Sequence, residues 1–216
     1  MMEQSLTRVV HSGVCLAAFL GWYLCSILAW GMPGFSALYQ SGLAVSFLHV
    51  AILLPFSLFA WKIYCAHYPF LPLGRFSLRG LLLPLLAISV LALIYGNFAH
   101  PEPWMDSFDG QTTFVKAMTI FSICLCAPIG EEIIFRGLVL NSSIGWGRWA
   151  KRTGIVITSL VFCAVHSQYQ TAASFIYLFI FSAILCVVRI NTRSLIMPMA
   201  LHAINNMWAV LIMFVL

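Results

Sequence analysis

The sequence predicts an all-α protein, a polytopic bundle of about seven transmembrane helices. Of its 216 residues, 62% are hydrophobic and 8% are charged, whereas soluble domains are about 45–50% apolar and about 25% charged. The mean hydropathy of +0.98 leaves too little polar surface to cover a compact fold in water. Apolar runs of spanning length recur along the whole chain. These observations exclude a soluble globule, a disordered chain and a disulfide-stapled secreted domain.

The first half of the chain predicts three spans. The run over residues 9–30 is too long for a signal-peptide core and is followed by no small-residue cleavage site, so we expect it to be retained. A second run covers 41–64, and the basic, proline-containing segment 67–79 separates it from a third run over 80–98. The wet, acidic stretch 100–111 follows, and we expect it to lie outside the hydrocarbon.

The second half predicts four further spans. The fourth apolar run covers 113–140 and is interrupted at Pro128–Glu132 by the polar sequence P-I-G-E-E. Arg136 is a second anomaly in the same run. The remaining apolar runs cover residues 154–166, 172–190 and 194–216.

The distribution of basic residues predicts the orientation in the membrane. The net charge is +5, from eleven Lys and Arg against six Asp and Glu. Positively charged loops stay on the cytoplasmic side, which predicts a cytoplasmic N-terminus and an external C-terminus. Nine basic residues fall on one side of the predicted spans: Arg8, Lys62, Arg75, Arg79, Arg148, Lys151, Arg152, Arg189 and Arg193.

Two classes of site are excluded by pattern. No basic stripe is interleaved with aromatic residues, so we expect no nucleic-acid partner. The seven cysteines include no C-x-x-C pair, and most lie inside apolar runs. We therefore interpret them as small hydrophobic residues rather than as metal or redox ligands.

Five ionisable residues lie inside predicted spans: Glu131, Glu132, Arg136, His166 and His202. Such residues are costly in a bilayer, so they are functional candidates that face a protein interior. Glu132 and Arg136 are four residues apart and can neutralise each other on one helix face. Glu131 is rotated about 100° away and has no partner in its own helix, which favours a role as general base. The helical rise places Glu131, His166 and His202 in one layer about 12–18 Å deep.

Three ordered motifs lie on separate spans: E-E-x-x-x-R at Glu131, Glu132 and Arg136, F-x-x-x-H at Phe162 and His166, and H-x-x-x-N at His202 and Asn206. Through these motifs the sequence resembles the membrane-embedded CAAX-protease and bacteriocin-processing family, also called CPBP or Abi, of glutamic-type intramembrane endopeptidases. The resemblance covers about the C-terminal half and implies that residues 113–216 form a four-helix catalytic core in one membrane domain. The apolar runs predict that residues 1–112 form three N-terminal transmembrane helices and the acidic outer loop.

The resemblance implies hydrolysis of a peptide bond by a water held inside the bundle. By this analogy Glu131 is the general base, and His166 helps to bind and orient the water. His202 and Asn206 would donate hydrogen bonds to the developing oxyanion, a stabilisation of about 3–4 kcal/mol per donor in other hydrolases. The implied substrate is a membrane-anchored protein or peptide precursor in the lipid bilayer. We expect the plasma (inner) membrane of a prokaryote and leave the oligomeric state open.

The other motif residues have structural interpretations. We expect Glu132 and Arg136 to be scaffold, and Phe162 to wall the site. The histidines that match no motif are interpreted as packing residues: His11, His49, His67 and His100.

Three alternatives remain open at this stage. Glu131, His166 and His202 form a plausible zinc set, although we expect no cofactor because the H-E-x-x-H helix is absent. A non-catalytic membrane protein, such as a bacteriocin-immunity protein or a scaffold, would also resemble the family, but the intact motifs count against it. A proton-coupled transporter would place ionisable residues in both halves, whereas here they gather in one.

Overall fold

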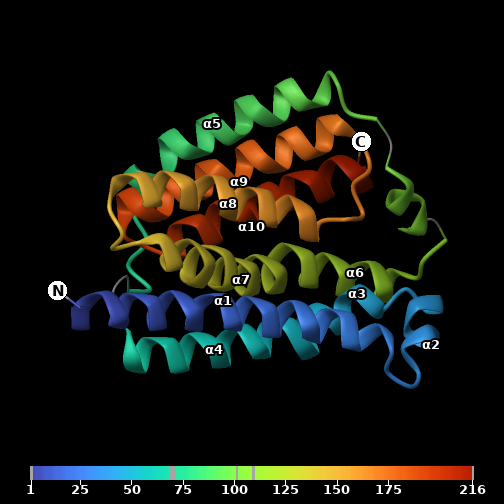
Figure 1. Ribbon diagram of the computed structural model, residues 1–216. Coiled ribbons are helices and arrows are strands. Elements are labelled where there is room, and N and C mark those ends of the chain that lie inside the picture. Colours follow the sequence, from blue (N-terminus) through green and yellow to red (C-terminus); the bar gives the residue numbers. More distant parts are fainter. Residues whose placement is uncertain (1, 69–71, 101, 109, 216) are drawn as a thin grey trace.

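The computed structural model describes residues 2–68, 72–100, 102–108 and 110–215, and the regular structure in these residues is helical throughout. Long helices lie side by side along one shared direction, and the two termini lie at opposite ends (Figure 1). Where consecutive helices join without a break, they count as one rod, and the described residues then form seven long rods and two short separate helices, Phe35–Gln40 and Pro103–Phe108. The predicted all-α bundle is confirmed.

The N-terminal half builds three of these rods. Its elements are α1 (Met2–Trp30), α2 (Phe35–Gln40), α3 (Ala44–Phe47), the π-helix η1 (Leu48–Leu53), α4 (Leu54–His67) and α5 (Leu78–Gly96). Gly34 and Gly42 adopt φ values of 84° and 78° in the tight turns on either side of α2, a conformation that glycine adopts without strain. Ser77 begins α5, because its hydroxyl accepts a hydrogen bond from the Gly80 amide at 3.3 Å.

The C-terminal half builds the other four rods. Its elements are the 3₁₀-helix η2 (Pro103–Phe108), α6 (Thr113–Phe121), the π-helix η3 (Ser122–Cys126), α7 (Ala127–Glu132), the π-helix η4 (Ile133–Val139), the 3₁₀-helix η5 (Leu140–Ser143), α8 (Arg148–Val165), α9 (Ala172–Thr192) and α10 (Ile196–Val215). The elements from α6 to η5 follow one another directly and form a single rod.

This rod, residues 113–143, is the centre of the bundle. Its apolar window is 67% buried, against 11–44% for the other candidate spans. The helix continues through Pro128–Glu132, the residues that interrupt the apolar run. Pro128 lies in the first turn of α7, directly after η3. The wider turn of the π-helix η3 shifts the pattern of backbone hydrogen bonds just before Pro128. Although proline lacks an N–H, the rod therefore continues through it.

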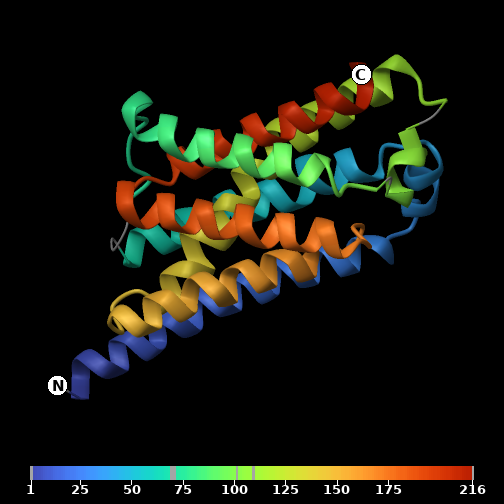
Figure 2. The same cartoon turned by 90° about the horizontal axis from the view of Figure 1, so that it is seen from above.

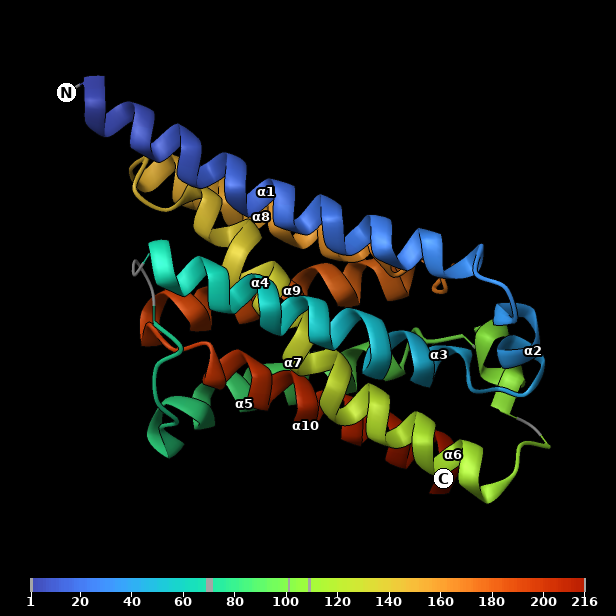
Figure 3. The same ribbon diagram turned by 90° about the horizontal axis from the view of Figure 1, so that it is seen from below.

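The other helices surround the central rod. α1 and α4 lie on one side, and α8, α9 and α10 lie on the other (Figure 1). Seen from below, α7 lies between α4 and α10 (Figure 3). Seen from above, α5 lies along the outside of α9 and α10 (Figure 2). The central rod therefore contacts elements from both halves of the chain.

The described helices include five that are long and apolar enough to span a bilayer. Sequence analysis predicted about seven spans, and the difference lies in α8 and α10. The first turns of α8 carry Arg148, Lys151 and Arg152, and the apolar part of α10 is the shorter segment Ile196–Ile212. Large apolar side chains are exposed on the outer face, for example Leu83 at 75%. The protein is a multi-pass integral membrane protein.

Gly130 and Gly137 of the central rod face α4. A Cβ atom at Gly130 would lie 3.5 Å from the Leu54 Cα, and one at Gly137 would lie 2.9 Å from the Trp61 ring. The first is an ordinary contact, whereas the second leaves no room for a side chain without movement of Trp61. Because Glu131 follows Gly130, this packing brings the candidate site next to the junction of η1 and α4.

Candidate active site

Glu131 is a buried carboxylate that faces imidazoles from two other helices. The residue is 7% exposed. Its Oε2 atom lies 3.7 Å from Nε2 of His166 and 3.9 Å from Nε2 of His202. Both distances exceed that of a hydrogen bond, and among the described residues Oε2 has no hydrogen-bond partner. The structure thus brings together three residues that the sequence placed in one layer.

Glu132 forms a buried polar network instead. Its Oε1 atom accepts hydrogen bonds from Arg136 Nη1 at 2.8 Å and from His202 Nδ1 at 2.8 Å. Arg136 Nη2 also donates to the hydroxyl of Ser182 on α9, at 2.8 Å. Glu132, Arg136 and Ser182 are fully buried. The i,i+4 pair therefore forms as its spacing predicts, and it additionally holds His202.

His166 is positioned by the end of α8. The helix ends at Val165, and His166 caps it with φ −91° and ψ 49°. Its Nδ1 donates to the Phe162 carbonyl oxygen at 2.7 Å, one turn earlier. In the neutral ring this leaves Nε2, which points toward Glu131, as a hydrogen-bond acceptor. The F-x-x-x-H spacing is therefore the spacing of this local hydrogen bond.

Phe162 packs at the centre of the cluster and is 1% exposed. Its ring centroid lies 4.3 Å from that of His166 and 5.9 Å from that of His202. The Arg136 guanidinium lies over the same ring, 4.7 Å from its centroid, a favourable cation–π geometry. Phe162 thus contacts the buried Arg136 guanidinium and packs beside both imidazoles.

Asn206 makes a different contact from the one expected of an oxyanion donor. Its Nδ2 donates to the backbone oxygen of Ile123 at 2.7 Å, which ties α10 to η3. One of its two amide hydrogens is therefore already engaged. The neighbouring Asn205 accepts a hydrogen bond from the hydroxyl of Tyr177 on α9, at 2.5 Å. Among the described residues, no hydrogen bond joins Asn206 to the Glu131 Oε2 atom.

His49, which sequence analysis interpreted as a packing residue, lies within electrostatic range of the candidate site. His49 lies in η1, the segment packed against α7, and interacts electrostatically with Glu131, His166 and His202. It makes no hydrogen bond with another described residue, whereas His11, also interpreted as packing, bonds to Tyr64 at 3.0 Å. The sequence offers one general indication that His49 is a candidate, because it is an ionisable residue inside an apolar run.

The described residues contain no group of three or more His, Cys, Asp or Glu side chains arranged to hold a metal ion. Glu131, His166 and His202 are the residues that a zinc ion would use, and their arrangement does not meet the geometry of such a site.

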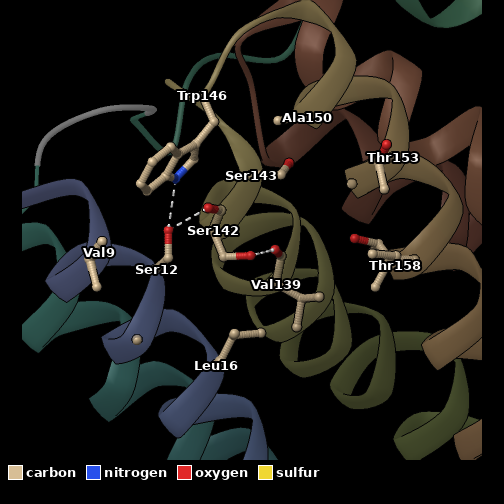
Figure 4. Close-up of a pocket in the computed structure, with 13 residues that line it drawn as sticks. Val9, Ser12, Leu16, Val139, Ser142, Ser143, Trp146, Ala150, Thr153 and Thr158 are labelled. Atoms are coloured by element: carbon tan, nitrogen blue, oxygen red, sulfur yellow. Dashed lines mark hydrogen bonds between the residues drawn. The ribbon is translucent and has the colours of Figure 1, made fainter. Parts of the chain in front are cut away.

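A groove elsewhere in the bundle is separate from this cluster. It lies between α1, η5 and α8 and has a volume of about 580 Å³ (Figure 4). Trp146 Nε1 donates to the Ser12 hydroxyl at 3.1 Å, and Ser12 donates to the Ser142 carbonyl oxygen at 2.6 Å. None of the candidate site residues lines this groove.

Fold and site together define a class of protein: a multi-pass helical membrane protein with a buried carboxylate between imidazoles. Residues 113–208 match the family model described as type II CAAX prenyl endopeptidase Rce1-like. A relative from Escherichia coli, an uncharacterized 24.3 kDa protein, is 31% identical over 201 residues, covering 85% of this chain and 92% of the relative. No solved structure matches.

The chain belongs to the Rce1-like family, as the resemblance of its motifs predicted. The matched segment contains all seven motif residues, from Glu131 to Asn206. This is a family of proteases that act on membrane-associated proteins, so the chain is a peptide hydrolase at the level of its family.

Proposed function

We propose that the protein is an intramembrane endopeptidase in which Glu131 activates a water molecule for attack on a peptide bond. The observation that carries this proposal is the Glu131 Oε2 atom, buried without a hydrogen-bond partner among the described residues and facing two imidazole Nε2 atoms. A buried polar atom without a partner costs free energy. That cost is expected where the atom must bind a reactant.

Glu131 Oε2 and His166 Nε2 are neighbouring acceptors, and one water molecule can donate a hydrogen bond to each of them. His166 donates from Nδ1 to Phe162, so its neutral ring offers Nε2 as an acceptor. A water that donates one hydrogen to Glu131 and the other to His166 directs its oxygen lone pairs away from both. Glu131 then takes the proton as the water oxygen attacks the scissile carbonyl carbon, and returns it to the leaving nitrogen as the C–N bond breaks.

His202 is suited to stabilise the oxyanion when its ring is protonated. Its Nδ1 donates to Glu132, so a neutral ring has Nε2 as an acceptor, whereas an imidazolium donates from both nitrogens. Asn206 is the second expected donor, through the amide hydrogen that the Ile123 carbonyl leaves unused.

The implied substrate is a membrane-anchored protein or peptide precursor, in the plasma membrane of a prokaryote. Relationship to an Escherichia coli protein supports a prokaryotic setting. The connections α4–α5, η5–α8 and α9–α10 lie at the same end of the bundle as the N-terminus (Figure 1). These connections and the adjoining helix ends carry most of the basic residues, which supports a cytoplasmic N-terminus.

Co-expression with a library of tagged, membrane-anchored peptides tests the function. We expect products with the wild type and none with Glu131→Gln at matched expression, whereas His67→Gln, at an exposed helix end, retains cleavage. The products then identify the substrate class. If no peptide is cut while a phenotype such as bacteriocin resistance survives in Glu131→Gln, the protein acts by binding and the proposal is wrong.

A further inference from the structure

Glu102 is a buried carboxylate that the catalytic proposal does not use. It lies in the connection between α5 and α6, within the acidic stretch expected to be wet, yet it is 2% exposed. Its carboxylate accepts four hydrogen bonds, all from the start of α9. The donors are the Gln170 amide at 2.9 Å, the Thr171 amide at 3.3 Å, the Thr171 hydroxyl at 3.1 Å and the Ser174 hydroxyl at 2.6 Å.

These contacts are not required to cap α9. The hydroxyl of Thr171 already accepts a hydrogen bond from the Ser174 amide at 3.2 Å, so the helix has its own N-cap. Glu102 comes from a segment about 70 residues earlier in the chain. Its hydrogen bonds therefore join the α5–α6 connection to the α8–α9 connection. The capping of α9 alone does not explain them.

The segment that Glu102 holds begins with His166. Residues 166–171 join α8 to α9, and the Tyr169 amide donates to the His166 carbonyl oxygen at 3.1 Å. The Tyr169 ring centroid lies 6.3 Å from that of His166, and the edge of Trp104 packs against Tyr169 with centroids 5.6 Å apart. The connection that carries Glu102 thus contacts this segment twice, through hydrogen bonds and through an aromatic pair.

A second branch of the network reaches α10. The Ser174 hydroxyl, which donates to Glu102, also forms a hydrogen bond with the Tyr95 hydroxyl at 2.9 Å. The Tyr95 ring packs against that of Tyr177 at 4.6 Å, and the Tyr177 hydroxyl donates to Asn205 at 2.5 Å. Asn205 is in the same turn of α10 as His202 and Asn206. Both imidazoles that face Glu131 therefore sit on segments connected to Glu102.

We propose that Glu102 is a positioning residue, which latches the connection between α5 and α6 onto residues 166–171 and thereby holds the His166 imidazole against Glu131. Its hydrogen bonds are charge-assisted, the stronger class in proteins. The expected effect on turnover rests on the proposed function. The latch, meaning the hydrogen bonds by which Glu102 holds the segment that begins with His166, does not depend on it. A displacement of about 1 Å in a catalytic group can slow a reaction about 100-fold.

The activity test compares Glu102→Ala and Glu102→Gln with Asp106→Asn, which removes the same charge from the same connection. We expect kcat to fall between about 10- and 100-fold in Glu102→Ala, with KM changed less than about twofold. Glu102→Gln keeps one acceptor oxygen and should lie between Glu102→Ala and the wild type. A general loss of folded protein would instead lower the active fraction and leave the kcat per folded molecule unchanged, which would contradict the proposal.

Two readouts that need no turnover separate the latch from the proposed function. In Glu102→Ala we expect the Gln170 and Thr171 amides to exchange hydrogen for deuterium at least about tenfold faster than in Asp106→Asn. We expect diethyl pyrocarbonate to modify His166 severalfold faster, measured by mass spectrometry. Unchanged exchange and unchanged modification overturn the latch. If these rates rise while the wild type cuts no substrate, the latch stands and the proposed function fails.

Discussion

Glu131 and Glu132 are adjacent, yet the structure predicts opposite consequences for their substitution. Glu132 accepts hydrogen bonds from two groups that carry or can carry positive charge, Arg136 and His202, both at 2.8 Å. Hydrogen bonds to charged groups contribute about 1.5–3 kcal/mol each. A buried charge left without its partner costs about 3–5 kcal/mol. We therefore expect Glu132→Gln to lower the free energy of unfolding by about 3–5 kcal/mol.

Glu131→Gln should lower the free energy of unfolding by less than about 1 kcal/mol, because its Oε2 atom has no hydrogen-bond partner to lose among the described residues. The assay is denaturant unfolding of each purified variant in detergent micelles, followed by tryptophan fluorescence. The double variant Glu132→Gln with Arg136→Met removes both charges, so it should be more stable than Glu132→Gln alone. Equal losses for Glu131→Gln and Glu132→Gln would refute the assignment of one as reactive and the other as scaffold.

Three further outcomes are expected. His49→Gln should lower kcat more than tenfold while His67→Gln leaves it unchanged, measured with one identified substrate; equal rates would remove His49 from the site. Burial opposes ionisation of Glu102, but the hydrogen bonds from Ser174, Gln170 and Thr171 outweigh it and hold its pKa below the ordinary 4.5, so its stabilisation is complete above pH 4.5 and is lost as pH falls further. The melting-temperature gap between wild type and Glu102→Gln should therefore shrink from pH 6 to pH 3, and a gap that does not change would contradict this. A C-terminal reporter should be active only outside the cytoplasm, and cytoplasmic activity would reverse the predicted orientation.

The sequence predicts the features that depend on the spacing of residues within one helix. Apolar runs of spanning length become helices because the bilayer leaves backbone groups no other partner. The pair Glu132 and Arg136 forms because residues four apart are neighbours on a helix. His166 bonds to the Phe162 carbonyl oxygen for the same reason. The motifs therefore indicate both the helices and the residues that meet at Glu131.

Contacts between distant segments could not be predicted in this way. The bond from His202 to Glu132 joins residues 70 positions apart, and it depends on how α10 packs against α7. His49 comes within electrostatic range of Glu131 because η1 packs against α7. The π-helical turn before Pro128 accommodates that proline within the continuous rod. None of these outcomes is visible in the periodicity of a single segment.

The role of Glu131 as general base is tested most directly by purified enzyme acting on one identified peptide. Product is quantified by mass spectrometry for the wild type and Glu131→Gln, with and without a strong zinc chelator. We expect the wild type to cleave equally fast with chelator, and Glu131→Gln to be slower by about 100-fold or more while it unfolds at the same denaturant concentration. Cleavage by Glu131→Gln within tenfold of the wild type would contradict the assignment of the base. Loss of wild-type activity in chelator, with recovery on added zinc, would establish a metal-dependent mechanism instead.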